Sequence, residues 1–308
     1  LPTKPGSGLD AVAWWRAAQA GDVAARGRLE AYNRADCALL AELVRRPTVE
    51  LPNRIGWTDA ACAAAPTYAW GALQGLRGRP EGVPQGSDAW RALRSGKVTA
   101  SLAGAALNAS PLMTREDAHE ALRGELQVEE TAAMARGRAD EPLARLAYTR
   151  ATGRVVAPCG IYVARDVDWL AASPDGIVVD CDGVAKGCVE LKLPANGQPR
   201  AISDGYLLQC LVQCRCAELR WCDFVSVGGQ RLLVQRVELD REFFDEEFLP
   251  LLRAFHAAAA DEFVDPLTPA EDVQLRQALR DYRATRVSAP RAYAHGVEGL
   301  APAAVVAA

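Results

Sequence analysis

Histidines and closely paired cysteines are scarce in this sequence. Its 308 residues include three histidines, and none of its nine cysteines belongs to a C-x-x-C pair. Structural zinc sites depend on such ligands at short spacings, so we do not expect one here. Cys210, Cys214 and Cys216 lie close together, but the first two are four residues apart, which suits one face of a helix. We therefore expect reduced cysteines in the core of an intracellular protein.

Long apolar runs and a signal peptide are also missing. Because a membrane-spanning helix needs about 20 apolar residues, we expect a soluble protein that is not secreted. The net charge of −4 excludes the general basic excess that is typical of nucleic-acid-binding domains, although basic residues can still gather locally. The length suffices for one large domain or two ordinary ones. Since the first residue is Leu, we expect a piece of a longer chain.

The segment 171–194 has the pattern of a β-hairpin that carries acids. A short β-branched run at 177–179 and a second apolar run at 188–193 flank a turn-rich break. Asp175 stands just before the first run, between Pro174 and Gly176. Glu190 and Lys192 are two apart on the second run, so they point to the same face, and the apolar residues between and beside them point to the other.

Two carboxylates that converge across a hairpin are suitable ligands for a hard cation. Mg²⁺ prefers a few carboxylates plus water, and Mn²⁺ is the expected substitute. Lys192 places its amino group beside Glu190, where it can orient or deprotonate a metal-bound water. It can also stabilise charge on a phosphate under attack. The alternative is a simple salt bridge between Glu190 and Lys192 at the edge of a sheet.

The amino-acid sequence of the hairpin resembles a known nuclease motif. Asp175 followed fifteen positions later by Glu190-x-Lys192 is similar to the motif of restriction-endonuclease-like nucleases. The longer form, SPDG at 173–176 followed by ELK-x-P at 190–194, resembles the YqaJ/lambda-exonuclease family of viral recombination nucleases. Leu193 stands where that family usually has Cys, a position that the chemistry does not need.

Three further blocks follow the family's order. WRALRSGKVTAS at 90–101 resembles its opening motif, which implies that Arg94 and Ser101 bind a terminal 5′-phosphate. The block around Glu141 implies an acid near the metal, and Y-x-x-Q-x-x-x-Q implies that Gln209 lines the site. Each has a plainer alternative: Arg94 and Gln209 on solvated helix faces, Ser101 as an N-cap, and Glu141 in the first turn of a helix that begins near Pro142.

The resemblance implies an α/β (α+β) fold with a restriction-endonuclease-like core, in which helices flank a central mixed β-sheet, and extra N-terminal helices. It also implies a Mg²⁺-dependent exonuclease that degrades double-stranded DNA 5′→3′. Asp175, Glu190 and the carbonyl of Leu191 would hold the ion with Glu141 nearby, while Lys192 and Gln209 position the attacking water. The implied partners are DNA ends and a single-strand annealing protein, in the cytoplasm or nucleus of the host cell, with the chain a monomer or a homotrimer.

Two other readings of the site remain open. The same fold could carry an endonuclease or a structure-specific nuclease, in which Arg94 and Ser101 would be dispensable. It could also be a non-catalytic DNA-binding module with a decayed site, although the presence of every acid argues against this.

The chain divides by pattern into four parts. We expect an N-terminal helical segment at 1–46 that is a remnant of an upstream domain, a linker at 47–85, the nuclease domain at 86–264, and a helix with a loose tail at 265–308. Tyr32 and Asp36 in the first part resemble the last motif of DnaQ-like 3′–5′ exonucleases, and an ordinary amphipathic helix is the alternative.

Periodicity predicts the elements of the nuclease domain and the C-terminal helix. Helices are expected within 115–151 and at 206–216, 240–260 and 269–283. Strands are expected at 221–227 and 231–239, joined by a turn at Gly228-Gly229, and one more strand is expected at 155–156 or at 160–164.

Overall fold

The computed structural model describes residues 23–25, 85–126, 132–180, 184–194, 196–259, 265 and 267–297. Residues 23–25 are helical, and all other elements described here belong to one compact unit, residues 73–180 and 184–308. Tyr32, Asp36, the linker up to residue 84 and the end of the tail lie outside the described residues, and the domain boundaries remain predictions. In the described part, no helix is both long enough and apolar enough to cross a membrane.

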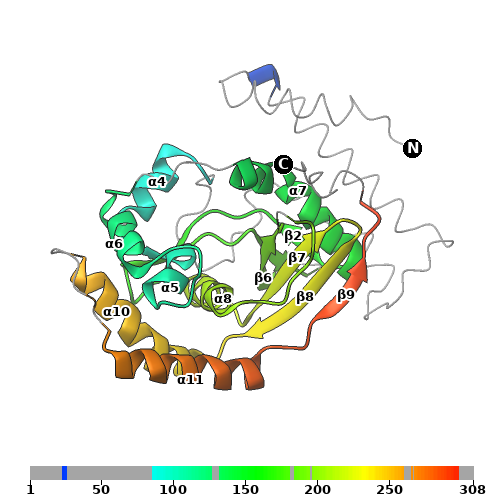
Figure 1. Ribbon diagram of the computed structural model, residues 1–308. Helices are drawn as coiled ribbons and strands as arrows, with labels where there is room; N and C mark the ends of the chain where they lie inside the picture. The colour runs from blue at the N-terminus through cyan, green and yellow to red at the C-terminus, as the bar shows by residue number, and fades with distance from the viewer. Residues whose placement is uncertain are drawn as a thin grey trace, which may run out of the picture. The chain divides into compact units, whose positions relative to one another are not determined.

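A mixed sheet of six strands, counted over the described residues, forms the centre of the unit (Figure 1). Its order is β2-β5-β6-β7-β8-β9. The strands are β2 (Val155–Ala157), β5 (Gly176–Val179), β6 (Ala185–Lys192), β7 (Trp221–Gly228), β8 (Arg231–Glu238) and β9 (Arg291–Ala294). Only β6 and β7 pair in parallel, and α8 (Asp204–Ala217) supplies the crossover that a parallel pair requires.

A smaller sheet supports the other side of α8. It contains β1 (Val98–Thr99), β4 (Leu170–Ala172) and β3 (Tyr162–Val163), in the order β1-β4-β3. Helix α8 contacts β3 and β4 of this sheet as well as β6, β7 and β8 of the large one. It is therefore buried along most of its length, which explains why apolar residues occur around its whole circumference.

Helices cover both faces of the large sheet, as Figure 1 shows. On one face, α7 (Ala132–Thr152) packs Ala147 and Tyr148 into a core with Val189 and Leu191 of β6. Glu190 points to the opposite face, toward α8. The predicted alternation along this strand is confirmed, and so is the predicted fold class, a central mixed sheet flanked by helices.

The remaining described helices lie before α7 and after β8 in the chain. They are α4 (Asp88–Arg94), α5 (Ala100–Ala106), α6 (Arg115–Arg123), α9 (Arg241–Phe243), the π-helical turn η1 (Phe244–Phe248), α10 (Leu249–Ala258) and α11 (Pro269–Arg286). Side-chain oxygens of Ser87, Ser203 and Asp240 cap α4, α8 and α9 by accepting hydrogen bonds from backbone N–H groups. The six cysteines in the described part are free and buried, as the sequence predicted.

Several local predictions need correction. Both candidate strands in 154–170 exist, as β2 and β3. The hairpin after β7 turns at Gly229-Gln230, since Gly228 still pairs with Arg231. Helix 240–260 is interrupted by η1. Residues 291–294 are not loose tail but β9, an edge strand paired with β8. Finally, Pro142 lies inside α7, so Glu141 is not in a first turn.

The crossing of α5 and α8 depends on two glycines. A Cβ added at Gly104 would lie 2.8 Å from the Cα of Gly205, so the two helix backbones touch directly. These helices carry Ser101 and Gln209, so their separation also sets the distance between two predicted site residues.

We predict that Gly104→Ala lowers the free energy of unfolding by about 1–3 kcal/mol, because backbone cannot yield as a side chain can. Gly137→Ala in α7 is the matched control: apart from the backbone of its own helix, no described atom lies within 4 Å of its added Cβ, and Ala should stabilise the helix by about 0.5–1 kcal/mol. Urea denaturation measures both changes. Equal stability of the Gly104→Ala variant and the wild type would contradict the close crossing.

Candidate active site

Asp175 ends the pairing between β5 and β6. Its backbone N–H donates to the carbonyl of Val189 at 3.1 Å, and its carboxylate Oδ2 accepts from the N–H of Leu191 at 2.6 Å. The carboxylate thus replaces the strand partner that β5 no longer provides beyond Gly176. Gly176 is required there, because a Cβ would lie 2.3 Å from Val156 Cγ1 on β2. Since both backbone groups of a strand residue point to one side, the carbonyl of Leu191 lies at the same open edge.

Glu190 is a carboxylate with only 1% of its surface exposed. Burying such a charge is costly unless donors surround it. Three side chains donate to Glu190: Lys192 Nζ at 2.5 Å and Gln209 Nε2 at 2.7 Å bind Oε1, and Gln213 Nε2 at 2.5 Å binds Oε2. Gln213 is completely buried and was missed as a site residue. Its spacing of four from Gln209, on the same helix face, was the available signal.

Lys192 is held as an ammonium group in this arrangement. Burial alone would lower its pKa, but the attraction of Glu190 and Asp175 outweighs burial and raises the pKa of Lys192. Its Nζ also lies 4.7 Å from the centre of the Tyr206 ring. Of the roles that the sequence left open for Lys192, orienting a water and stabilising phosphate charge need this protonated form, whereas deprotonating a water does not.

Carboxylates repel one another in this region. Burial and the charge of Glu190 raise the pKa of Asp175 well above its usual range, with a further contribution from Glu141. Burial also raises the pKa of Glu141, partly offset by Arg145, and Glu190 raises it further. Such mutual destabilisation is typical of acids that share a cation.

Arg145 links two of these acids. Its Nη2 donates to Glu141 Oε1 at 2.5 Å and to the backbone carbonyl of Asp175 at 2.9 Å. Glu141 and Arg145 are one turn apart on α7. Sequence reasoning missed Arg145, although its spacing of four from Glu141 indicated that the two side chains would meet.

A second group of side chains surrounds Arg94. Its Nη2 lies 3.4 Å from Ser101 Oγ, which is 3.1 Å from Thr99 Oγ1, and its guanidinium lies 4.3 Å from the centre of the Trp90 ring. Within the described residues, no carboxylate pairs with Arg94, and burial lowers its pKa. A desolvated cation without an acid partner is a ready site for an anion.

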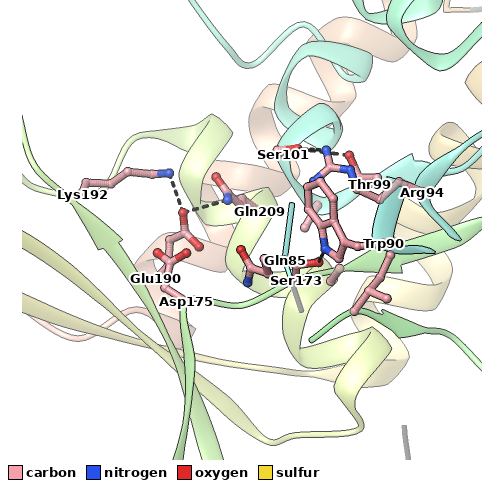
Figure 2. Close-up of a pocket in the computed structure, with 13 residues that line it drawn as sticks. Gln85, Trp90, Arg94, Thr99, Ser101, Ser173, Asp175, Glu190, Lys192 and Gln209 are labelled. Carbon is pink, nitrogen blue, oxygen red and sulfur yellow. Dashed lines mark hydrogen bonds and ion pairs between the residues drawn. The ribbon is translucent and has the colours of Figure 1, made fainter. Parts of the chain in front are cut away.

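The two groups face a common pocket of about 190 Å³. Figure 2 shows the Arg94 group on one side, the acids and Lys192 on the other, and Gln85, Ser173 and Gln209 between them. Trp90 Nε1 donates to Ser173 Oγ at 2.9 Å, which fastens α4 to the SPDG loop. Six of the eight predicted site residues line this pocket: Arg94, Ser101, Asp175, Glu190, Lys192 and Gln209. Glu141 is not among the lining residues and reaches the site through Arg145.

The donor set fits a hard divalent cation with few protein ligands. No three His, Cys, Asp or Glu side chains in the described part are arranged to hold one metal ion together. The candidate metal ligands are the carboxylates of Asp175 and Glu190 and the carbonyl of Leu191. Among the described residues, no hydrogen-bond donor binds Oδ1 of Asp175, so this oxygen is open to an ion. Mg²⁺ suits such a set, because it commonly binds one or two carboxylates and completes its shell with water and substrate phosphate.

Asp175→Asn should stabilise the metal-free protein at neutral pH. The pKa of Asp175 is higher in the folded protein than in the unfolded chain, where it is about 3.9. The free energy of unfolding therefore falls as the pH rises from about 3.9 through the folded-state pKa. Asn removes the repelled charge and can still accept from Leu191 N–H. We predict that the variant melts about 2–4 °C higher in EDTA at pH 7, or about 1 kcal/mol.

The advantage of the Asn variant should shrink as the pH falls to the unfolded value of about 3.9 and below it, where Asp175 becomes protonated in both states. Asp168→Asn, at an exposed loop acid, should change neither melting curve. An Asp175→Asn protein that melts lower than the wild type at pH 7 would contradict the repulsion.

One family model matches the part of the chain that contains this site. Residues 89–220 match the model of the YqaJ-like viral recombinase domain. That segment contains all eight predicted site residues, but it is shorter than the 86–264 over which the resemblance was expected. No curated protein matches the chain.

Two solved structures are similar over a larger part of the chain. The alkaline exonuclease LHK-Exo from Laribacter hongkongensis is 28% identical, with 63% of this chain and 99% of that chain covered and a TM-score of 0.46. The same enzyme in complex with dAMP gives the same values. Residues 89–220, the part of the chain that holds the site, are thus similar to the YqaJ-like viral recombinase domain.

Proposed function

We propose that this chain is a Mg²⁺-dependent deoxyribonuclease that degrades double-stranded DNA from its 5′ ends. The observation that carries the proposal is that one pocket brings paired acids and an ammonium group opposite Arg94, a partly buried cation that pairs with no carboxylate among the described residues. An exonuclease needs both parts, one to hydrolyse a phosphodiester and one to hold the end of the strand. The match of residues 89–220 to the YqaJ-like viral recombinase domain supports the same activity.

The acid side of the pocket would hold the ion and the water. Asp175, Glu190 and the carbonyl of Leu191 are the proposed ligands, with Glu141 nearby. When bound, the ion would polarise the attacking water and neutralise charge that grows on the phosphate. Gln209 and Gln213 hold the carboxylate of Glu190 in one orientation. Lys192, as an ammonium, would orient the water and stabilise the negative charge of the phosphate under attack.

The Arg94 side of the pocket would set polarity. A 5′-terminal phosphate carries more negative charge than a bridging one, and the guanidinium of Arg94 with the hydroxyl of Ser101 would bind it. A strand anchored by its 5′ end presents its next phosphodiester to the acids. Degradation would then leave a 3′ single-stranded tail, which a strand-annealing protein could bind. The oligomeric state, monomer or homotrimer, stays open in this proposal.

We predict that the wild type, with Mg²⁺, removes nucleotides from the 5′ ends of linear duplexes and leaves a closed circle intact. EDTA or Asp175→Asn should abolish cleavage. Lys192→Ala should lower kcat about 10²–10³-fold, the usual loss for one charge-stabilising group. Gel analysis of end-labelled strands measures the rate and the direction.

Arg94→Ala tests the phosphate anchor separately. A charge-assisted hydrogen bond contributes about 1.5–3 kcal/mol, so the variant should lose about 10–100-fold in kcat/KM on 5′-phosphorylated ends. Its rate on 5′-hydroxyl ends should hardly change. Arg91→Ala is the matched control, because Arg91 lies on the same helix and pairs with exposed Asp88. Nicking of the circle by the wild type would favour an endonuclease, and DNA binding without any cleavage would favour a non-catalytic module.

A further inference from the structure

Arg145 is a basic side chain of α7 that the structure joins to the acid site. Its Nη2 binds both the carboxylate of Glu141 and the backbone carbonyl of Asp175, at 2.5 and 2.9 Å. The second contact spans thirty residues of sequence and joins the helix to the loop that carries Asp175. Neither the sequence patterns nor the proposed mechanism gives Arg145 a role.

The burial of Arg145 is costly and therefore informative. Its side chain is only 21% exposed, and its Nε is buried without a hydrogen-bond partner. Leaving a guanidinium N–H unsatisfied costs free energy, which a surface salt bridge would not require. The two contacts made by Nη2 must outweigh that cost, and both acceptors belong to the acid site.

Two roles are consistent with a cation in this place, and they predict opposite effects on metal binding. As a mere counter-charge, Arg145 would compete with a divalent ion for the field of the carboxylates, so its removal would strengthen metal binding. As a positioning residue, it would fix Glu141 and the Asp175 backbone, so its removal would weaken binding. The bond to an uncharged carbonyl of Asp175 argues for the second role, because a counter-charge does not need it.

We propose that Arg145 is a positioning residue that fixes Glu141 and the backbone at Asp175 in the geometry that receives a divalent cation. This inference rests on the proposed metal-dependent function of the same site. Replacing a residue that holds a metal ligand in place typically lowers metal affinity or activity by about 10–100-fold.

Isothermal titration calorimetry of the full chain with Mn²⁺ measures metal binding directly, so it tests the inference without relying on catalysis. Arg145→Gln removes the charge and the fork, whereas Arg145→Lys keeps the charge on a shorter, non-planar group. We expect both variants to bind Mn²⁺ about 10–100-fold more weakly than the wild type. Arg150→Gln, further along α7, is the control and should bind normally, since the hydrogen bond of Arg150 is to the carbonyl of Gly296 and not to an acid of the site.

Nuclease assays over a range of Mg²⁺ concentrations give the second readout. Half-saturation by Mg²⁺ should rise in both Arg145 variants, and methylguanidinium should partly rescue Arg145→Ala, which a purely structural role would not allow. Tighter Mn²⁺ binding by Arg145→Gln, or unchanged binding by both variants, would overturn the inference alone. A wild type that binds no Mn²⁺ would overturn the proposed function and this inference with it.

Discussion

The buried charge of Glu190 is the constraint on which the rest of the site depends. Glu190 lies on β6, in the middle of the sheet, with 1% of its surface exposed, so its donors must come from the face above the strand. Two of them are glutamines of α8, which ties that helix to the sheet. Because α8 crosses α5 at direct backbone contact, the same constraint brings Ser101 to the pocket. One buried carboxylate thereby sets the relation between the two halves of the site.

The pocket differs from a structural charge cluster on the same sheet in how fully its carboxylates are neutralised by cations. Asp223 of β7 is equally buried, but Tyr148 donates to it at 2.6 Å and Arg236 at 2.8 Å, with Arg154 3.6 Å away. There, cations outnumber the acid. Around the pocket, the cations that bind the carboxylates of Glu190 and Glu141 in the described residues are Lys192 and Arg145, and the pKa values of Asp175 and Glu141 are raised. Such an excess of negative charge reduces stability, and it is the feature that a divalent cation would relieve.

Short-range patterns predicted the hairpin and the alternation along β6, because both follow from a local period of hydrophobicity. The convergence of Ser101 with Glu190 could not be read from local pattern, since it depends on how α5, which carries Ser101, crosses α8, whose glutamines bind Glu190. Gln213 and Arg145 were missed because one polar residue on a helix is usually solvated. The strand β9 was missed because a short edge strand, exposed on both faces, carries no alternating pattern.

The most direct test of this account is a crystal structure with Mn²⁺, examined by anomalous diffraction. We predict one peak in the pocket, bound by Oδ1 of Asp175, by Glu190 and by the carbonyl of Leu191, with Arg145 still joined to Glu141 and to the carbonyl of Asp175. A pocket without an anomalous peak at saturating Mn²⁺, or a peak away from Asp175 and Glu190, would contradict the central claim that these acids form a metal site.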